Sequence, residues 1–404
     1  MPIDFNSHFY MPNVQPNIVN AQLIKQNQLM KDTFIKSVDL NYDGIKIEQK
    51  SFGKIKKTGE EAHLFTITNK NGAKVDLSTY GATVTGIKVP DKTGKLVDVT
   101  QGYNKVSAYE ECPVGHAGGT IGPYANKISD GKFELNGEIF QLERNKDNGK
   151  SHSHGGSEGF DVKNWDAKVL QDGIEFTYIK PDMENNYPGN VETKVTYKFD
   201  NNNQLHIIYS AKSDKDTIIN LTNHTYFNLD GTQNAKENSV LDHFVTLPNS
   251  TKITKVNELG IPTGEFLKVK DSPFDFKSAK QLKDVIYEDN EQLKLVKGFD
   301  HNYCIDGYDG KSLIEAAKIE SDKSGIVLKV YTNLPGFQFY TANNLGKPLQ
   351  PNGKQGQKYE KRSGLCVEPQ FYPNAINTQN FSDKGVLLAG EEYNREIVYS
   401  FGLK

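Results

Sequence analysis

The 404-residue chain is poor in cysteine and has no long hydrophobic run. Its three cysteines, Cys112, Cys304 and Cys366, are widely spaced and odd in number. This usage fits reduced thiols better than a disulfide framework, which requires paired cysteines. The cysteine content therefore favours a cytoplasmic location.

An excess of charge of one sign is also absent. The chain carries 48 basic and 51 acidic residues, a formal net charge of −3. Such a balance produces no overall field that would attract polyanions or an anionic membrane surface. No stretch approaches the roughly 20 apolar residues of a membrane-spanning helix, and the first thirty residues lack the basic-then-apolar order of a secretory signal. We expect neither a nucleic-acid partner nor a membrane partner.

The first 45 residues differ from the remainder in composition and in the spacing of their apolar residues. They are rich in asparagine and glutamine, and between positions 20 and 38 their apolar residues are spaced for one face of a helix. We expect an N-terminal extension over residues 1–45 that is partly helical. Its apolar face would pack on the main domain or bind a partner. Apolar residues make up 36% of the chain, enough for one large core, and we expect a single main domain over 46–404.

Beyond residue 45 the dominant period of the apolar residues is two, which is typical of half-buried strands. Alternating runs predict strands over 174–178, 191–199, 205–211, 326–331, 337–341 and 397–401, and a short run begins at Val75. The Asn136-Gly137 pair between 132–135 and 138–142 predicts a tight hairpin, because both residues tolerate a positive φ. Only the segment 276–287 has a helical pattern in this region.

Strands joined by turns without intervening helices exclude a parallel βαβ architecture. The pattern instead indicates an all-β fold, a large antiparallel β-sandwich with few short helices. No internal repeat and no clear linker appears after residue 45. One large sandwich is therefore preferred over two domains.

Three histidines, His154, His224 and His301, lie in polar segments flanked by glycine or asparagine, where a side chain could face a cleft. His152 and His154 form a His-x-His pair, but on a strand such a pair supplies at most two metal ligands. Since neither a cysteine cluster nor a His-Glu-x-x-His motif accompanies the pair, no metal is expected.

Glu368 is an ionisable residue inside an apolar strand, and Pro369 confines that strand to the edge of a sheet. A buried carboxylate must be hydrogen-bonded or functional, because burying it unpaired costs several kcal/mol. His224 lies among amide and hydroxyl side chains that could hold one tautomer of its ring. Spacing alone favours His224 as a structural histidine between two strands.

Taken together and in chain order, a series of segments resembles the aldose 1-epimerase family, also called galactose mutarotases. The matching segments are YGAT (80–83), PD (90–91), GTIGPYANKI (119–128), HGG (154–156), GFD (159–161), NYPG (186–189), NLTNHTYFNL (220–229), IPTG (261–264), PFDF (273–276), GFDH (298–301), LPGFQFYTAN (334–343) and EPQ (368–370). They extend from about residue 46 to the C-terminal region. The family fold, a large antiparallel β-sandwich, agrees with the alternation described above.

The resemblance implies an isomerase that interconverts the α and β anomers of free aldohexoses such as glucose and galactose, without a metal or other cofactor. By position, Glu368 matches the family's general base and His224 its general acid, which donates to the ring oxygen of the sugar. The resemblance further implies that hydroxyl groups of the sugar are bound by a second set of side chains. This set comprises His154, Asp300, Asn126, Tyr340 and Gln370, and from the sequence alone Tyr340 could equally pack in the core.

One position departs from the family pattern. The family commonly has an arginine in the motif after Gly122, and this chain has Lys127. Lysine keeps the charge but loses the planar fork that can bind two oxygens. We therefore expect Lys127 to contact the sugar with weaker or altered selectivity.

Three alternatives remain at this point. A non-catalytic carbohydrate-binding protein on the same fold would require neither Glu368 nor His224. A hexose 6-phosphate epimerase would require several basic side chains around its site, of which Lys127 alone is evident. A glycosidase would require two carboxylates flanking the scissile bond, for which Asp300 and Glu368 are candidates. The oligomeric state is not indicated by the sequence.

Overall fold

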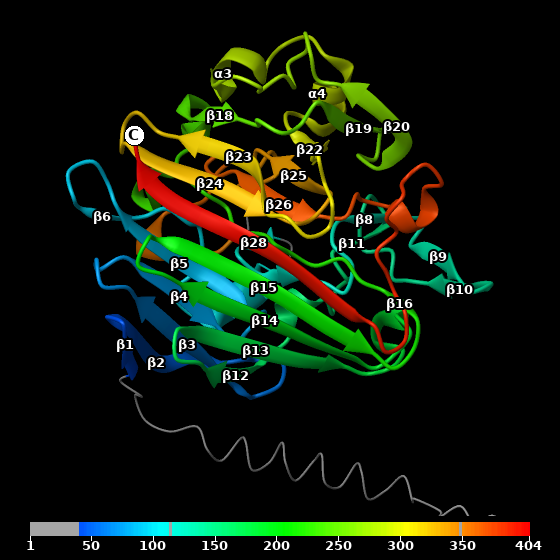
Figure 1. Ribbon diagram of the computed structural model, residues 1–404, viewed down its shortest axis with the longest axis horizontal. Coiled ribbons are helices and arrows are strands. Elements are labelled where there is room, and N and C mark those ends of the chain that lie inside the picture. The colour runs from blue at the N-terminus through cyan, green and yellow to red at the C-terminus, as the bar shows by residue number, and fades with distance from the viewer. Residues whose placement is uncertain (1–39, 113–114, 347–349) are drawn as a thin grey trace, which may run out of the picture. The chain divides into compact units, whose positions relative to one another are not determined.

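The computed structural model describes residues 40–112, 115–346 and 350–404 (Figure 1). Residues 39–404 form one unit, and the description below concerns that unit. The helix expected between positions 20 and 38 lies outside the described residues. The first described strand, β1 (Leu40–Tyr42), pairs with β2 (Ile45–Lys54), so the sheet begins before the expected boundary at residue 46.

Three large sheets contain most of the strands, and every ladder between named strands of these sheets is antiparallel. The six-stranded sheet follows chain order: β1, β2, β3 (Glu61–Thr68), β4 (Lys74–Ser78), β5 (Thr83–Pro90) and β6 (Leu96–Asp98). The nine-stranded sheet has the order β12 (Asp166–Val169), β13 (Gly173–Lys180), β14 (Val191–Phe199), β15 (Gln204–Ser213), β28 (Glu392–Leu403), β24 (Ile326–Thr332), β23 (Ile314–Glu320), β18 (Phe244–Thr246) and β21 (Lys280–Gln281). The five-stranded sheet has the order β20 (Pro262–Lys268), β19 (Lys252–Val256), β22 (Asp300–Cys304), β25 (Gly336–Tyr340) and β26 (Cys366–Gln370).

Four two-stranded ladders complete the sheet structure. They pair β9 (Lys132–Leu135) with β10 (Glu138–Gln141), β8 (Lys127–Ser129) with β11 (Ser151–Ser153), β7 (Thr120–Ile121) with β17 (Thr222–Asn223), and β16 (Thr217–Ile218) with β27 (Val386–Leu387). In Figure 1 the C-terminal strand β28 runs between β15 and β24, which lie far from it in sequence.

One large hydrophobic core joins the sheets. Its buried side chains come from the six-, nine- and five-stranded sheets, for example Phe65, Phe176 and Phe339. The ring of Phe65 on β3 contacts that of Phe176 on β13, with 6.1 Å between the ring centres. Along β14 the exposure alternates strictly, as the sequence pattern predicts for a strand with one face in the core. The expected all-β sandwich is therefore confirmed.

The predicted hairpin at Asn136-Gly137 is present, and both residues have positive φ, 53° and 79°. The predicted helix over 276–287 is wrong. Only α3 (Leu282–Val285) forms there, because the backbone upstream bonds to other segments: the carbonyl of Phe276 accepts from Leu247, and β21 pairs with β18. The apolar residues of this segment pack into the core without helical repetition.

Two short helices were not expected from the sequence, α2 (Val106–Glu111) and α4 (Glu291–Val296). The side chain of Asn290 caps α4 by accepting from the amides of Gln292 and Leu293. Among the described residues, no helix is long and apolar enough to cross a membrane.

The five-stranded sheet has one face in the core and one face toward a cavity. On β25, Phe337 and Phe339 point into the core, so Gln338 and Tyr340 point to the opposite side. Antiparallel pairing then aligns the three adjacent strands β22, β25 and β26 in register. This register determines which polar residues meet on the cavity side.

Candidate active site

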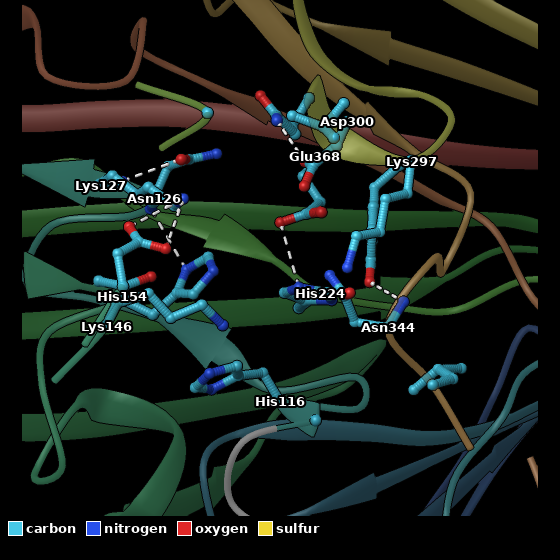
Figure 2. A pocket seen from close by; sticks show the side chains of 18 of the residues that line it. His116, Asn126, Lys127, Lys146, His154, His224, Lys297, Asp300, Asn344 and Glu368 are labelled. Atoms are coloured by element: carbon cyan, nitrogen blue, oxygen red, sulfur yellow. Dashed lines mark hydrogen bonds and ion pairs between the residues drawn. The ribbon is translucent and has the colours of Figure 1, made fainter. Parts of the chain in front are cut away.

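A cavity of about 380 Å³ lies against the polar face of the five-stranded sheet (Figure 2). It is lined by seven of the eight residues expected to act on a sugar: Asn126, Lys127, His154, His224, Asp300, Tyr340 and Glu368. The eighth, Gln370, is fully buried on β26 but does not line the cavity. The structure thus brings together side chains separated by more than 200 positions in the sequence.

Two cross-strand rows build the sheet side of the cavity. One row pairs Asp300 with Tyr340 and Tyr340 with Cys366. The next row pairs Gln338 with Glu368. Strand β26 is the edge of its sheet, as Pro369 predicted, so Glu368 lies beside segments from outside the sheet.

Glu368 is 2% exposed, and among the described residues its Oε2 atom has no hydrogen-bond partner. Burial, reinforced by the nearby Asp300 carboxylate, raises the pKa of Glu368 well above its usual value. A buried carboxyl group that accepts no strong donor is poised to exchange a proton with a bound molecule.

His224 follows β17 and faces Glu368, with 3.7 Å between His224 Nε2 and Glu368 Oε2. Its backbone is fixed on both sides: the amide donates to the carbonyl of Gly119, and the carbonyl accepts from Gly118. Gly118 has a φ of 70°, and a Cβ atom there would overlap the carbonyl oxygen of Val84. A glycine is therefore required to bring this segment close enough to hold His224.

The imidazole of His224 is almost completely buried, and burial lowers its pKa to about 3. Repulsion from His116 adds to this effect. The other ring nitrogen, Nδ1, lies 3.6 Å from the sulfur of Cys366. Because that side of the ring is occupied, Nε2 is the nitrogen directed to Glu368 and the cavity.

His154 and Asn126 are linked through their backbones. The amide of Asn126 donates to Nδ1 of His154 over 3.2 Å, and the amide of His154 donates to the carbonyl of Asn126. An amide can only donate, so in neutral His154 the proton resides on Nε2. Burial, together with His116 and His224, holds the pKa of His154 well below its usual value. His154 is thus a neutral donor at the cavity wall.

Asp300 accepts a 2.7 Å hydrogen bond from Nε2 of Gln338, its neighbour on β25. Burial raises the pKa of Asp300. The hydroxyl of Tyr340 accepts from the amide of Asn344, which holds the ring nearly perpendicular to that of His224. These contacts fix an acceptor and an aromatic wall beside Glu368 and His224.

Lys127 lines the cavity, but its ammonium already has protein partners. It donates to the carbonyl oxygen of Leu259 and lies 3.1 Å from a carboxylate oxygen of Asp147. Lys127 therefore ties the loop at 258–260 to the segment around Asp147.

Several cavity residues were not found by sequence reasoning. His116 lies 4.7 Å from His154 and 5.8 Å from His224, measured between ring centres, and its Nδ1 is 2.7 Å from Asp161. Lys146 and Lys297 also line the cavity. The only available signal was the match of Asp161 to the GFD motif, which says nothing of its histidine partner.

The structure places the other histidines that the sequence singled out, His301 and the His-x-His pair, differently from one another. His301 does not face a cleft: it packs on Phe274 in the core, because its neighbour Asp300 occupies the cavity face of the same strand. The His-x-His pair also separates. His152 bonds to the carbonyl of Glu143 and the hydroxyl of Tyr187, whereas only His154 reaches the cavity.

The side chains that could share a metal ion lie at Glu368 and His224, not at the His-x-His pair. Within the described part of the chain, one group of His, Cys and acidic side chains is close enough to share an ion: His224, Cys366 and Glu368, whose ligand atoms lie within 4.8 Å of one another.

A model of the aldose 1-epimerase family matches residues 63–400. Galactose mutarotase from Bos taurus is 37% identical over 331 residues, which cover 82% of this chain and 91% of the bovine protein. Galactose mutarotase from Homo sapiens is 36% identical over 353 residues, 87% of this chain and 97% of the human protein. Among solved structures, an aldose epimerase homologue from C. elegans superimposes with a TM-score of 0.74 at 30% identity, covering 84% of this chain and 98% of that chain.

The match covers the cavity-lining residues and all the segments that carry the sequence resemblance, and it begins after β1 and β2. The chain belongs to the aldose 1-epimerase family of isomerases.

Proposed function

We propose that the chain is a mutarotase that interconverts the α and β anomers of free aldohexoses, with Glu368 as general base and His224 as general acid. The observation that carries this assignment is the facing pair itself, a buried carboxylate and a buried imidazole 3.7 Å apart at the wall of the cavity. The volume of about 380 Å³ falls in the range of small-ligand pockets. The relatives named galactose mutarotase support the reaction.

The protonation of the pair suits the chemistry. Burial raises the pKa of Glu368 and lowers that of His224 to about 3, so between these two pKa values a proton shared by the pair resides on the carboxyl group. Transfer of that proton to the imidazole makes Glu368 a base and His224 an acid. With the proton on the carboxyl group, the roles are exchanged.

In ring opening, Glu368 takes the proton from the anomeric hydroxyl while Nε2 of His224 donates a proton to the ring oxygen. The C1–ring oxygen bond breaks, and C1 becomes an aldehyde. After rotation about the C1–C2 bond, Glu368 returns its proton to the aldehyde oxygen, and His224 takes back the proton of the ring hydroxyl as the bond reforms. The pair ends in its starting state, and each group contributes typically 10²–10⁴-fold.

The remaining cavity residues position the sugar. His154 donates from Nε2 to a hydroxyl group, and Asp300, fixed by Gln338, accepts from another. Asn126 supplies a further polar contact, and Tyr340 forms a wall beside the ring. Gln370 lies two residues after Glu368 on the same face of β26 and does not line the cavity.

The charge of the cavity favours a neutral sugar over a phosphorylated one. Three lysines line it: Lys127, Lys146 and Lys297. Five acidic residues accompany them: Glu111, Asp147, Glu258, Asp300 and Glu368. Lys127 is paired with Asp147, and Glu111 with Lys56, so the acidic residues of the lining balance its lysines and leave no excess positive charge for a phosphate.

Polarimetry on freshly dissolved α-glucose and α-galactose tests the proposal. We expect Glu368→Gln and His224→Asn each to reduce kcat at least about 100-fold, because each removes one member of the proton-exchanging pair. Glu265→Gln, an exposed substitution on β20, is the matched control and should retain full activity. Calorimetric titration with galactose should still detect binding to Glu368→Gln.

Full activity in both variants would contradict the assignment of acid and base. Absence of catalysed mutarotation in the unaltered chain, with galactose still bound, would favour the non-catalytic alternative. Rates for hexose 6-phosphates above those for free hexoses would overturn the substrate assignment.

A further inference from the structure

His116 lines the cavity, but the proposed mechanism does not use it. The residue begins a turn before β7, in which the amide of Gly119 donates to the carbonyl of His116 over 3.0 Å. Its φ is 50°, a left-handed backbone conformation that glycine adopts freely and that a histidine adopts only with strain. The turn therefore carries a strained imidazole where a glycine would be more stable, which points to a use for the side chain.

Asp161 holds the ring of His116 from one side. Its Oδ2 atom lies 2.7 Å from Nδ1 of His116, and the side chain of Asp161 is 5% exposed. Gly119 permits this approach, because a Cβ atom there would lie 2.8 Å from Cβ of Asp161. A carboxylate can only accept, so in neutral His116 the proton resides on Nδ1 and Nε2 is an acceptor. Asp161 thus sets both the orientation of the ring and its tautomer.

The other edge of the His116 ring is directed to the cavity. His116 lines the cavity whereas Asp161 does not, and Nε2 of His116 has no hydrogen-bond partner among the described residues. The centre of the His154 ring lies 4.7 Å from that of His116, and in neutral His154 the proton resides on Nε2. An acceptor and a donor therefore lie beside each other on one wall of the cavity.

A hydroxyl group is the chemical complement of this pair, because its oxygen can accept from His154 while its proton is donated to His116. The position of the pair indicates which hydroxyl group of a sugar would reach it. The ring centres of His116 and His224 are 5.8 Å apart, and in Figure 2 His116 and Glu368 lie on opposite sides of His224. With Glu368 at the anomeric hydroxyl and His224 at the ring oxygen, His116 faces the side of the ring oxygen away from C1. An aldohexose carries its CH₂OH group there, on C5.

We propose that His116, oriented by Asp161, determines specificity by binding the C6 hydroxyl group of an aldohexose together with His154. The inference rests on the proposed function, because the roles of Glu368 and His224 set the orientation of the sugar. It separates aldohexoses from sugars without this hydroxyl group, such as 6-deoxygalactose and the pentose xylose. His116 forms hydrogen bonds only and takes no part in the proton transfers at C1 and the ring oxygen.

The test is the ratio of kcat/KM for galactose to kcat/KM for 6-deoxygalactose, measured by polarimetry. In the unaltered chain we expect galactose to be preferred about tenfold, the effect of two hydrogen bonds to one hydroxyl group. His116→Phe keeps a ring without nitrogen atoms and should lose most of this preference, mainly through the KM for galactose. Each variant is compared with itself on two sugars, so an effect of the substitution on the basal rate does not enter.

Two further variants and a control sharpen the test. His116→Gly removes the side chain and suits the positive φ, so it should fold and lose the preference to the same extent. Asp161→Asn, which removes the charge beside Nδ1, should also lower the preference, and an unchanged preference would contradict the orienting role of Asp161. The matched control is His206→Phe on β15, which removes a histidine 2.8 Å from a carboxylate oxygen of Glu396 and outside the cavity. This control should retain the full preference.

Equal kcat/KM values for the two sugars in the unaltered chain would overturn the proposal, and so would an undiminished preference in both His116→Phe and His116→Gly. Calorimetric titration with galactose and 6-deoxygalactose separates this failure from failure of the proposed function. Tighter binding of galactose that is lost in His116→Gly, in a chain that catalyses no mutarotation, would support the hydroxyl site and contradict only the catalytic assignment. Catalysed mutarotation without any preference would leave the catalytic assignment intact and contradict the role of His116.

Discussion

Lys127 occupies the position where the family commonly has arginine, and its ammonium is bound to the loop around Leu259 and to Asp147. An ammonium has three donors but no planar fork, so these protein contacts leave little capacity for a bidentate contact with a sugar. The residue therefore acts as a link between two cavity segments as well as a candidate sugar ligand.

We expect Lys127→Arg to lower the KM for at least one aldose about fivefold, the effect of roughly 1 kcal/mol from one additional charged hydrogen bond, with little change in kcat. The measurement is mutarotation of glucose, galactose and xylose. The matched control is Lys252→Arg, which replaces the exposed first residue of β19. Unchanged Michaelis constants across the panel would refute a sugar-contacting role for this position.

Glu368 illustrates how a proposed catalytic residue costs stability. Its carboxyl group has a raised pKa in the folded state, so the folded chain binds more protons than the unfolded chain between the two pKa values. Stability contributed by this group is therefore lost as pH rises from the unfolded value of about 4.5 through the folded pKa. At neutral pH the raised pKa of Glu368 is therefore a net cost to the stability of the fold.

Replacement of this group by a neutral isostere should stabilise the protein. We expect Glu368→Gln to raise the melting temperature at pH 7 by about 2 °C, the shift that roughly 1 kcal/mol produces in a large domain. The gain should diminish as pH falls through and below 4.5, where the carboxyl group becomes protonated in both the folded and the unfolded chain. Calorimetry at several pH values measures this, with Glu265→Gln as the exposed control. A lower melting temperature at neutral pH would show that the carboxylate is well compensated.

At the residue scale the sequence identified candidate acid–base residues of the cavity but not all of their neighbours. Glu368 was identifiable because a carboxylate in an apolar run has a cost that requires a reason. His116 was not identifiable, since it lies in a glycine-rich segment with no periodic pattern, and only folding brings its ring to within 5.8 Å of His224. His301 was placed wrongly because the sequence does not say which face of β22 borders the core.

At the scale of elements, the strands and a local hairpin were predicted well, but the strand partners that lie far apart in the sequence were not. Alternation marked β13, β14, β15 and β24, and the turn residues marked the β9–β10 hairpin. The pairing of β25 with β26 joins segments about 30 residues apart, and no turn signal encodes it. That pairing sets Gln338 beside Glu368, so the cavity depends on a register that the sequence pattern leaves open.

The connection between β13 and β14 is organised by a buried lysine. Lys180 is 1% exposed, and its ammonium donates over 2.8 Å to each of three carbonyl oxygens, those of Pro181, Tyr187 and Gly189. The same loop reaches the cavity region, because Asn185 donates to the carbonyl of Gly155, next to His154. The lysine thus holds the loop that supports the HGG segment.

We expect Lys180→Met to destabilise the protein by about 3 kcal/mol, since it leaves three buried carbonyls without their donor. Loosening of the loop should also raise the KM for galactose more than it lowers kcat. Thermal unfolding and polarimetry measure the two effects. Lys194→Met on the neighbouring strand β14 removes a half-exposed lysine whose partner is Glu192 and should cost under about 0.5 kcal/mol. Equal effects of the two substitutions would show that the three carbonyl contacts contribute nothing specific.

For the molecule as a whole, the resemblance identified the fold and family, and physical patterning alone gave only the class. The nine-stranded sheet joins strands that extend from β12, at residue 166, to the C-terminal strand β28, which lies at its centre between β15 and β24. Such non-local pairings follow from a global packing optimum, and loop-closure entropy makes them slow to form. Local sequence patterns therefore do not predict these pairings.

Because β28 lies at the centre of its sheet, truncation at the C-terminal end should harm the fold more than truncation at the N-terminal end. Nine residue pairs join β28 to β15 and seven join it to β24, so its loss would divide the sheet and expose the core. In contrast, the core clusters begin at Ile45, and the cavity-lining residues lie between Glu111 and Glu368. We expect a chain that ends at Glu391 to be unfolded by circular dichroism and inactive, whereas a chain that begins at Asp39 should fold and keep its kcat/KM for galactose within about twofold. Full mutarotase activity in the chain without β28 would contradict the role of that strand, and an unfolded chain from Asp39 would mean that the sandwich depends on the preceding residues.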